Sequence, residues 1–284
     1  MQEAYPNLGF EVERIVSRGD KILDIPLTEI GGKGFFTSEL ESALTSGKID
    51  LAVHSLKDLP TETSDGVMIG AISRRANACD VLVAKKGYSL KTLPKGARVG
   101  TTSTRRSAQI LNWRPDLHIE SIRGNVDTRI KKARASESIY DAIVLARAGL
   151  ERLGRLDVIT EELSFDQMLP APGQGALGIQ CCNKECLVSL LKTINNPEAE
   201  LATTAERAFL ARLGGGCSLP IAAFACFESK QLNIRGRIIH PDGLDKIDVH
   251  DRISVQTIDE AYELGANLAQ KAITLGAKQL LKAE

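Results

Sequence analysis

The chain has no excess of charge of either sign, because 36 Lys and Arg residues balance 36 Asp and Glu residues among its 284 positions. Balanced charge excludes bulk electrostatic attraction to nucleic acid or to an anionic membrane. No stretch approaches the roughly 20 apolar residues that a membrane-spanning helix needs. The first residues, MQEAYPNLGFEVER, lack a basic segment followed by an apolar one, so we expect no signal peptide.

Cysteine patterns typical of disulfide frameworks or metal centres are also missing. A chain of this length builds a core without disulfide staples, and we expect its six cysteines to be reduced. Cys181, Cys182 and Cys186 lie close together, but they lack a paired C-x2-C and a histidine at ligand spacing. We therefore predict no metal site, and we place Cys181 and Cys182 at the end of a strand.

The first two thirds of the chain alternate between short apolar runs, which predict strands, and amphipathic runs, which predict helices. The predicted strands span 10–16, 49–53, 80–84, 98–102 and 142–146, and the predicted helices span 37–46, 103–113 and 125–135. This alternation predicts α/β architecture with open, mainly parallel sheets.

The last third has a different pattern. Asn196 and Pro197 predict the N-cap and first residue of a helix that continues to about residue 213. Strands near 221–227, 232–239 and 248–255 follow, and then a helical stretch over 258–281. This order predicts a separate α+β domain.

Two segments predict crossings between domains, the polar stretch 73–78 and the proline- and glycine-rich stretch 164–175. Paired crossings are what an inserted domain produces. We therefore predict a discontinuous first domain at 1–73 and 168–193, an inserted second domain at 74–167, and a third domain at 197–284. We find no internal repeat and no low-complexity tract.

Cys217 follows three glycines in the segment GGGCSLP, directly after the predicted helix that ends at Leu213. Glycines free the backbone and remove flanking side chains, so the thiol is presented on an open loop. Glycine is also common just after a helix, and Gly214 suits that position. The spacing alone leaves both interpretations open, an accessible reactive thiol or an ordinary helix end.

The segment HSLKDLP follows the predicted strand 49–53, so its polar residues lie at a strand's carboxyl end, where open α/β sheets bind ligands. Lys57 and Asp58 supply a cation beside a potential general acid or base. A solvated loop with an incidental charge pair is the commoner meaning of an isolated Lys-Asp.

Two further segments place basic residues at predicted helix starts, GTTSTRR over 100–106 and RGNVDTR over 123–129. A helix N-terminus favours anions, so arginine there opposes the helix dipole unless a bound anion is present. Each arginine alone could lie on the surface, but the pair of sites favours a polyanionic ligand. A third segment, GGKGFF over 31–36, lacks G-x4-G-K-[ST], which argues against nucleotide binding.

Taken together, eight segments resemble the porphobilinogen deaminase family, also called hydroxymethylbilane synthase, in identity and in order. They are GGKGFF, HSLKDLP, GTTSTRR, RGNVDTR, LARAGLERLG, LPAPGQGALGIQC, TAERAFL and GGGCSLPI. The resemblance covers essentially the whole chain. It implies two domains that resemble periplasmic binding proteins, the second inserted into the first, and a third domain that carries the reactive cysteine.

The resemblance also implies the roles of particular residues. Cys217 would hold a dipyrromethane cofactor through a thioether, and Asp58 would be the catalytic carboxylate at the pyrrole nitrogens and the departing amine. The cofactor's carboxylates would be bound by Lys57, Ser103, Arg105, Arg106 and Arg129. The substrate would be bound by Lys33, Phe36, Arg123 and Arg152, with Phe36 on a mobile loop over the site.

The implied reaction is the deaminating polymerisation of four porphobilinogen molecules to the linear tetrapyrrole hydroxymethylbilane on the dipyrromethane primer, with release of ammonia. Each ring brings two carboxylates, which accounts for many arginines in a chain of zero net charge. We expect a monomer that acts on this small molecule in the cytoplasm, or in the plastid stroma of a photosynthetic eukaryote.

One departure from the family concerns the start of the chain. The family begins with a strand that ends in Arg-x-Ser-x-Leu-Ala, followed by a helix, whereas residues 1–8 resemble the tail of that helix. We therefore expect the first strand to be missing and the first domain to be weakened. Three alternatives remain: a two-lobed anion-binding protein without catalysis, a cysteine-nucleophile enzyme, and an inactive truncated form of the deaminase. The second would need a base near Cys217, and the nearest later histidine is His240.

Overall fold

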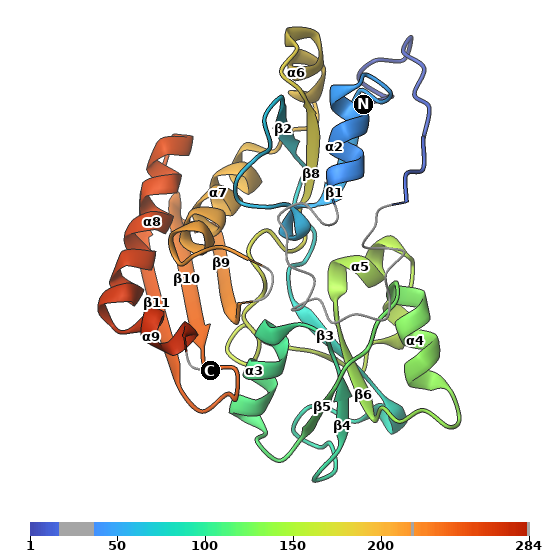
Figure 1. Ribbon diagram of the computed structural model, residues 1–284, viewed down its shortest axis with the longest axis vertical. Coiled ribbons are helices and arrows are strands. Elements are labelled where there is room, and N and C mark those ends of the chain that lie inside the picture. Colours follow the sequence, from blue (N-terminus) through green and yellow to red (C-terminus); the bar gives the residue numbers. More distant parts are fainter. Residues whose placement is uncertain (17–36, 217–218, 283–284) are drawn as a thin grey trace.

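The structure is a computed structural model that describes residues 1–16, 37–216 and 219–282. Three sheets lie in separate parts of the molecule: β1, β8 and β2 at the top of Figure 1, β3 to β6 at the lower right, and β9 to β11 at the left. This mixed α/β architecture with a separate C-terminal unit confirms the predicted fold class. Lys33, Phe36 and Cys217 lie outside the described residues.

The first sheet has the strand order β1-β8-β2, and both of its strand pairs are antiparallel. Its strands are β1 (Leu51–Ser55), β2 (Val67–Ile72) and β8 (Leu177–Cys182). The flanking helices are α2 (Ser38–Thr45) and α6 (Glu185–Leu191). Strand β8 ends at Cys182 as predicted, and it joins two strands from far earlier in the chain.

The second sheet has the order β5-β4-β6-β3-β7 and mixes parallel with antiparallel pairs. Its strands are β3 (Asp80–Ala84), β4 (Arg98–Gly100), β5 (His118–Glu120), β6 (Ala142–Ala146) and β7 (Glu161–Glu162). The α-helices of this part are α3 (Thr104–Trp113), α4 (Val126–Arg134) and α5 (Arg147–Arg152). Short 3-10 turns are η2 (Lys85–Gly87) and η3 (Leu156–Val158).

The prediction of mainly parallel sheets was wrong. Only β4 pairs in parallel fashion, with β5 and with β6, among the described strands. The reason is topological, because β3 and β8 come from segments next to the two crossings. A continuous apolar run predicts a buried strand and is typical of parallel sheets, but the way the chain connects the strands decides the direction of each pair.

The third sheet is an antiparallel meander of order β11-β10-β9, made of β9 (Ile221–Glu228), β10 (Gln231–Ile239) and β11 (Lys246–Ile253). One face packs on α7 (Pro197–Arg212) and α8 (Ile258–Thr274), with α9 (Ala277–Leu281) at the end. The packing is close, since a Cβ at Gly236 would lie 2.3 Å from the Phe209 ring.

Two local predictions were also wrong. Residues 10–16 contain no strand, because this stretch is mostly exposed, with Val12 at 97% exposure, and a strand needs a partner for its backbone groups. The helical stretch 258–281 is broken into α8 and α9, because Gly276 adopts φ +99°, which ends one helix and starts another.

The two predicted crossings lie side by side. The amide of Ala76 donates to the Gly175 carbonyl at 3.1 Å, and the Ser73 amide donates to the Leu177 carbonyl at 2.9 Å. Gly175 has φ +94°, and a Cβ there would lie 2.5 Å from the Ala76 oxygen, so this approach requires glycine. The domain boundaries stay a prediction, but the segments that carry them are in contact.

Within the described ranges, no helix is long and apolar enough to cross a membrane. The same residues contain no group of three or more His, Cys, Asp or Glu side chains placed to hold a metal ion.

Candidate functional site

The Lys57–Asp58 pair lies on a short 3-10 helix, η1 (Leu56–Asp58), that directly follows β1. Leu56 and Leu59 are buried and pack with Ile72, whereas Lys57 is half-buried and Asp58 is exposed. The order Leu-Lys-Asp-Leu explains the local fold, because the two buried leucines anchor the turn and leave the polar pair between them at its surface. The predicted position of these residues at the end of a strand is confirmed.

Lys57 is held by Gln174, a residue of the LPAPGQG segment. Its ammonium donates to the Gln174 Oε1 at 3.2 Å. Burial lowers the pKa of Lys57 to about 8. The carboxylates Asp58 and Asp80 act against this shift, and the two arginines at the start of α3 reinforce it. Lys57 is therefore mostly charged at pH 7 and loses its proton as the pH rises through about 8.

Helix α3 begins as the sequence predicts, with Ser103 as its N-cap. The Ser103 side chain accepts from the Arg106 amide at 3.4 Å, while its own amide donates to the Thr101 hydroxyl at 3.1 Å. These contacts satisfy backbone donors that a helix start leaves free. They also direct the first turn, with Arg105 and Arg106, toward the start of β3.

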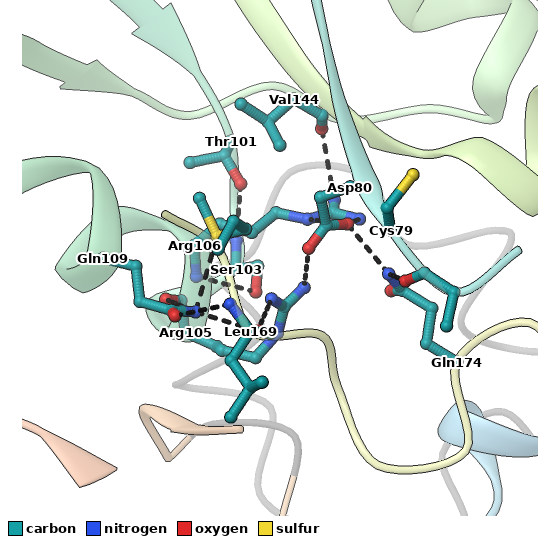
Figure 2. A network of polar contacts seen from close by, with 12 residues as sticks. Cys79, Asp80, Thr101, Ser103, Arg105, Arg106, Gln109, Val144, Leu169 and Gln174 are labelled. Atoms are coloured by element: carbon teal, nitrogen blue, oxygen red, sulfur yellow. Dashed lines mark hydrogen bonds and ion pairs between the residues drawn. The ribbon is translucent and has the colours of Figure 1, made fainter. Parts of the chain in front are cut away.

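Asp80, the first residue of β3, lies between the two guanidinium groups (Figure 2). Its Oδ2 is 2.7 Å from the Arg105 Nη2, and its Oδ1 accepts from the Arg106 Nη2 at 2.7 Å and Nε at 3.1 Å. Asp80 is fully buried, and both arginines are about 5% exposed. The anion that the first arginine pair attracts in this structure is therefore an internal carboxylate.

The electrostatics of Asp80 follow from this geometry. Burial alone would raise its pKa, but the two guanidinium groups outweigh burial and hold the pKa of this carboxyl well below its usual range. Gln174 adds a third contact, because its Nε2 donates to Asp80 Oδ1 at 3.0 Å and to the Ala78 carbonyl at 2.7 Å. One buried amide thus connects Asp80 to Lys57.

The second arginine segment joins the same cluster. Arg129, in the first half of α4, donates from Nε to the Gly124 carbonyl at 2.7 Å. Burial lowers the pKa of Arg129, and repulsion from Arg106 and Arg123 adds to this effect while Asp58 opposes it. Arg129 is therefore close enough to interact with both the α3 arginines and the predicted catalytic carboxylate.

Arg152, at the end of α5, is exposed, and its Nη2 donates to the Gly175 carbonyl at 2.7 Å. It therefore contacts the GQG segment that also contains Gln174. The structure thus brings together Lys57, Asp58, Ser103, Arg105, Arg106, Arg123 and Arg129 at one site, with Arg152 attached through the crossing.

Sequence reasoning missed Asp80 and Gln174. Asp80 begins an apolar strand, and a carboxylate at the start of a buried run is itself a signal, because such a group needs a cationic partner. Gln174 lies between two glycines with positive φ, Gly173 and Gly175. That pattern indicates a turn pressed closely against another segment, and a polar residue there has a specific partner.

The fold and the site together define an α/β protein with a desolvated cationic cluster at strand ends, suited to a ligand that carries several carboxylates. The family model for the porphobilinogen deaminase dipyrromethane cofactor binding domain matches residues 1–189. The model for the porphobilinogen deaminase C-terminal domain matches residues 200–274. The chain belongs to the porphobilinogen deaminase family.

The chain is similar to the porphobilinogen deaminase of Pelotomaculum thermopropionicum, with 45% identity over 99% of this chain and 89% of that protein. It is 47% identical to the porphobilinogen deaminase of Roseiflexus castenholzii, over 99% of this chain and 91% of that protein. The same enzyme of Listeria welshimeri is 42% identical over 99% of this chain and 90% of that protein. Among solved structures, a YaeC-family lipoprotein from Enterococcus faecalis has a TM-score of 0.35 at 16% identity over 56% of this chain and 76% of that chain, which is too low to bear on the fold.

Proposed function

We propose that this chain is a porphobilinogen deaminase that joins four porphobilinogen molecules into hydroxymethylbilane, with release of ammonia. The observation that carries the proposal is the cationic cluster around Asp58. Among the described residues, the interactions of Lys57 and Arg129 bring four cations, Lys57, Arg105, Arg106 and Arg129, near two carboxylates, Asp58 and Asp80. A substrate with two carboxylates per ring matches this excess of positive charge.

The dipyrromethane cofactor fits the described residues on the same grounds. Burial lowers the pKa of Lys57, Arg105 and Arg129, and repulsion from neighbouring arginines adds to this shift. Bound carboxylates would offset that repulsion. Lys57, Ser103, Arg105, Arg106 and Arg129 would hold the cofactor's carboxylates. When bound through Cys217, the cofactor supplies the primer on which the chain of rings grows. Each charge-assisted contact contributes about 1.5–3 kcal/mol.

Asp58 would perform the acid–base work. It is exposed at the tip of η1, with Lys57 beside it and Arg129 within electrostatic range, so it can reach a substrate that these cations hold. A carboxylate there can assist protonation of the leaving amine and stabilise the positive charge that develops on the substrate ring. Lys33, Phe36, Arg123 and Arg152 would bind and cover the incoming substrate.

Intact mass spectrometry tests the proposal. We expect the purified protein to exceed its sequence mass by one dipyrromethane, and the variant Cys217→Ser to lose this increment while staying folded. Cys226→Ser is the matched control, because Cys226 is a half-buried thiol on β9 and should leave the adduct in place. An adduct that survives Cys217→Ser would contradict the assignment. A folded protein with no adduct and no turnover would favour the alternative of an anion-binding module.

The compartment and oligomeric state are part of the same proposal. All five cysteines of the described residues are free thiols, which supports a reducing compartment such as the cytoplasm or a plastid stroma. We expect a monomer, and sedimentation of the holoprotein over a range of concentrations checks this.

A further inference from the structure

The strongest unexplained contact outside the cationic cluster is made by Arg207, in the middle of α7. Its Nη1 donates to the Leu59 carbonyl at 3.0 Å and to the Leu56 carbonyl at 3.5 Å. Its Nη2 donates to the carbonyl of Pro60. One guanidinium group therefore holds three main-chain oxygens of the turn that carries Lys57 and Asp58.

The chemistry of Arg207 is unusual for a half-buried arginine. Among the residues that the structure describes, its hydrogen-bond partners are carbonyl oxygens, and no carboxylate forms an ion pair with it. Burial lowers the pKa of Arg207 to about 10, so it stays charged at neutral pH. A desolvated charge without a counterion is costly. The cost is offset by the hydrogen bonds that the guanidinium group donates to the carbonyls of Leu56, Leu59 and Pro60.

The same helix leads directly to the predicted attachment site. After α7 ends at Arg212, the amide of Gly214 donates to the Ala211 carbonyl at 3.1 Å and that of Gly215 to the Leu210 carbonyl at 2.9 Å. The glycine segment before Cys217 is therefore tied back onto α7.

The glycine segment also contacts the chain just after the turn that carries Asp58. A Cβ at Gly215 would lie 3.0 Å from the Thr61 hydroxyl, one residue beyond Pro60. At the other end of α7, Ala199 packs in the same apolar cluster as Leu56 and Leu59. Helix α7 thus contacts the Asp58 turn at its start, at Arg207 in its middle, and through the glycines that follow it.

We propose that Arg207 is a positioning residue that holds the Asp58 turn in register with the helix and glycine loop leading to Cys217. The inference rests on the proposed function. Because the guanidinium group spans three carbonyls of the turn, it fixes where Asp58 stands relative to the end of α7. Asp58 must meet the reacting rings of a chain that is anchored beyond the end of α7, so the turn and the helix need a fixed relative position.

The test is the variant Arg207→Met, which keeps much of the apolar stem and removes the donors. We expect kcat to fall about 10- to 100-fold, because a displacement of about 1 Å costs that much, while KM changes less than about twofold. The mass of the holoprotein should still include the primer. Hydrogen exchange of residues 56–61 should accelerate. Arg207→Lys, which keeps a charged donor, should recover part of kcat.

The matched control is Arg212→Met, since Arg212 is an exposed arginine at the end of the same helix. It should change neither exchange at 56–61 nor kcat. A double-mutant cycle with Asp58→Asn separates positioning from general stability, because a residue that acts through Asp58 loses its effect once that carboxylate is gone. We expect Arg207→Met to lower kcat less than about twofold in the Asp58→Asn background.

Three results would overturn the inference. One is equal exchange and turnover in Arg207→Met and Arg212→Met. Another is an equal loss of kcat with and without the Asp58 carboxylate, which would indicate a general structural role. The third is loss of the primer in both Arg207 variants, which would assign Arg207 to primer assembly. Failure of the proposed function is distinguishable from all three, because it would show as a missing adduct and missing turnover in the unsubstituted protein.

Discussion

At the scale of single residues, Asp58 combines exposure with a fixed position. Its neighbours Leu56 and Leu59 are buried, so the turn is anchored without any contribution from the carboxylate itself. We expect Asp58→Asn to lower turnover by at least about 10²-fold, because a lost general acid or base costs that much, and to leave the urea midpoint unchanged. The exposed Asp65→Asn is the control and should keep full turnover. Near-normal turnover in Asp58→Asn would assign the catalytic carboxylate elsewhere.

The lowered pKa of Lys57 predicts that carboxylate binding at this residue depends on pH. Burial lowers its pKa to about 8, so it carries its charge at pH 7 and loses the proton as the pH rises through 8. Since the cofactor's carboxylates would bind the charged form, the rate at which the cofactor-free protein takes up its primer should fall severalfold between pH 7.5 and pH 9.5. In Lys57→Arg the group stays charged over this range, so this alkaline fall should flatten. An identical fall in both proteins would show that another group controls it.

Replacing Asp80 should lower the stability of the folded protein by a large amount. It is the buried counterion of two buried arginines, and removing one partner of such a group costs about 3–5 kcal/mol of unfolding free energy. We expect Asp80→Asn to lose this amount in urea denaturation, along with most primer binding. Asp116→Asn breaks a solvent-accessible pair with Arg114 and should cost less than about 1 kcal/mol. Similar losses in the two variants would contradict the role given to burial.

Asp80 also makes the free energy of unfolding depend on pH in the acid range. The folded pKa of Asp80 lies below its unfolded value, so its contribution is complete above the unfolded value near 3.9 and disappears as the pH falls through the folded one. The unfolding free energy of the unsubstituted protein should therefore decline below about pH 4 more steeply than that of Asp80→Asn.

At the scale of elements, two helix starts offer a direct comparison. Ser103 caps α3 inside the site, and Thr257 caps α8 in a reciprocal arrangement with Glu260 in the C-terminal unit. Replacing either cap by Ala should cost about 1 kcal/mol of unfolding free energy. Only Ser103→Ala should also lower turnover, because its hydroxyl lies beside the arginines. Equal effects of the two variants on turnover would mean that Ser103 only caps its helix.

At the scale of the whole molecule, Glu206 joins three parts of the chain. This fully buried residue of α7 accepts from Arg75 at 2.6 and 3.0 Å, from the Gly173 amide at 2.7 Å and from the Ala225 amide at 2.6 Å. Both crossings and the third sheet therefore meet at one carboxylate. Glu206 therefore links the C-terminal unit, which has its own core, to the α/β part.

We expect Glu206→Gln to lower the unfolding free energy by about 3–5 kcal/mol and to uncouple the C-terminal unit. Trp113, the one tryptophan of the chain, lies on α3 and reports on the second sheet. Its fluorescence should no longer follow the circular dichroism transition in urea. The exposed Glu263→Gln should shift stability by less than about 0.5 kcal/mol. Coincident transitions in Glu206→Gln would show that other contacts hold the units together.

Much of the fold could be predicted because the signals are local. The strands at 80–84 and 142–146 were predicted with their observed bounds, and Asn196 and Pro197 start α7 as expected. A helix cap and the spacing of apolar residues each involve positions a few residues apart, so both can be recognised in the sequence. The stretch 10–16 shows the limit of this logic, because a strand-like sequence forms a strand only where another strand is available to pair.

The sequence by itself determined the family, the helix starts and the set of charged residues, since each depends on residue identity and short-range order. Only the tertiary structure decided how those charges are paired. Asp80, Gln174 and Glu206 lie far in sequence from the arginines and lysine that they hold, at separations of 25 to 131 residues. Such pairs form because burying a charge is costly unless folding brings a partner to it, and that cost acts through space rather than along the chain.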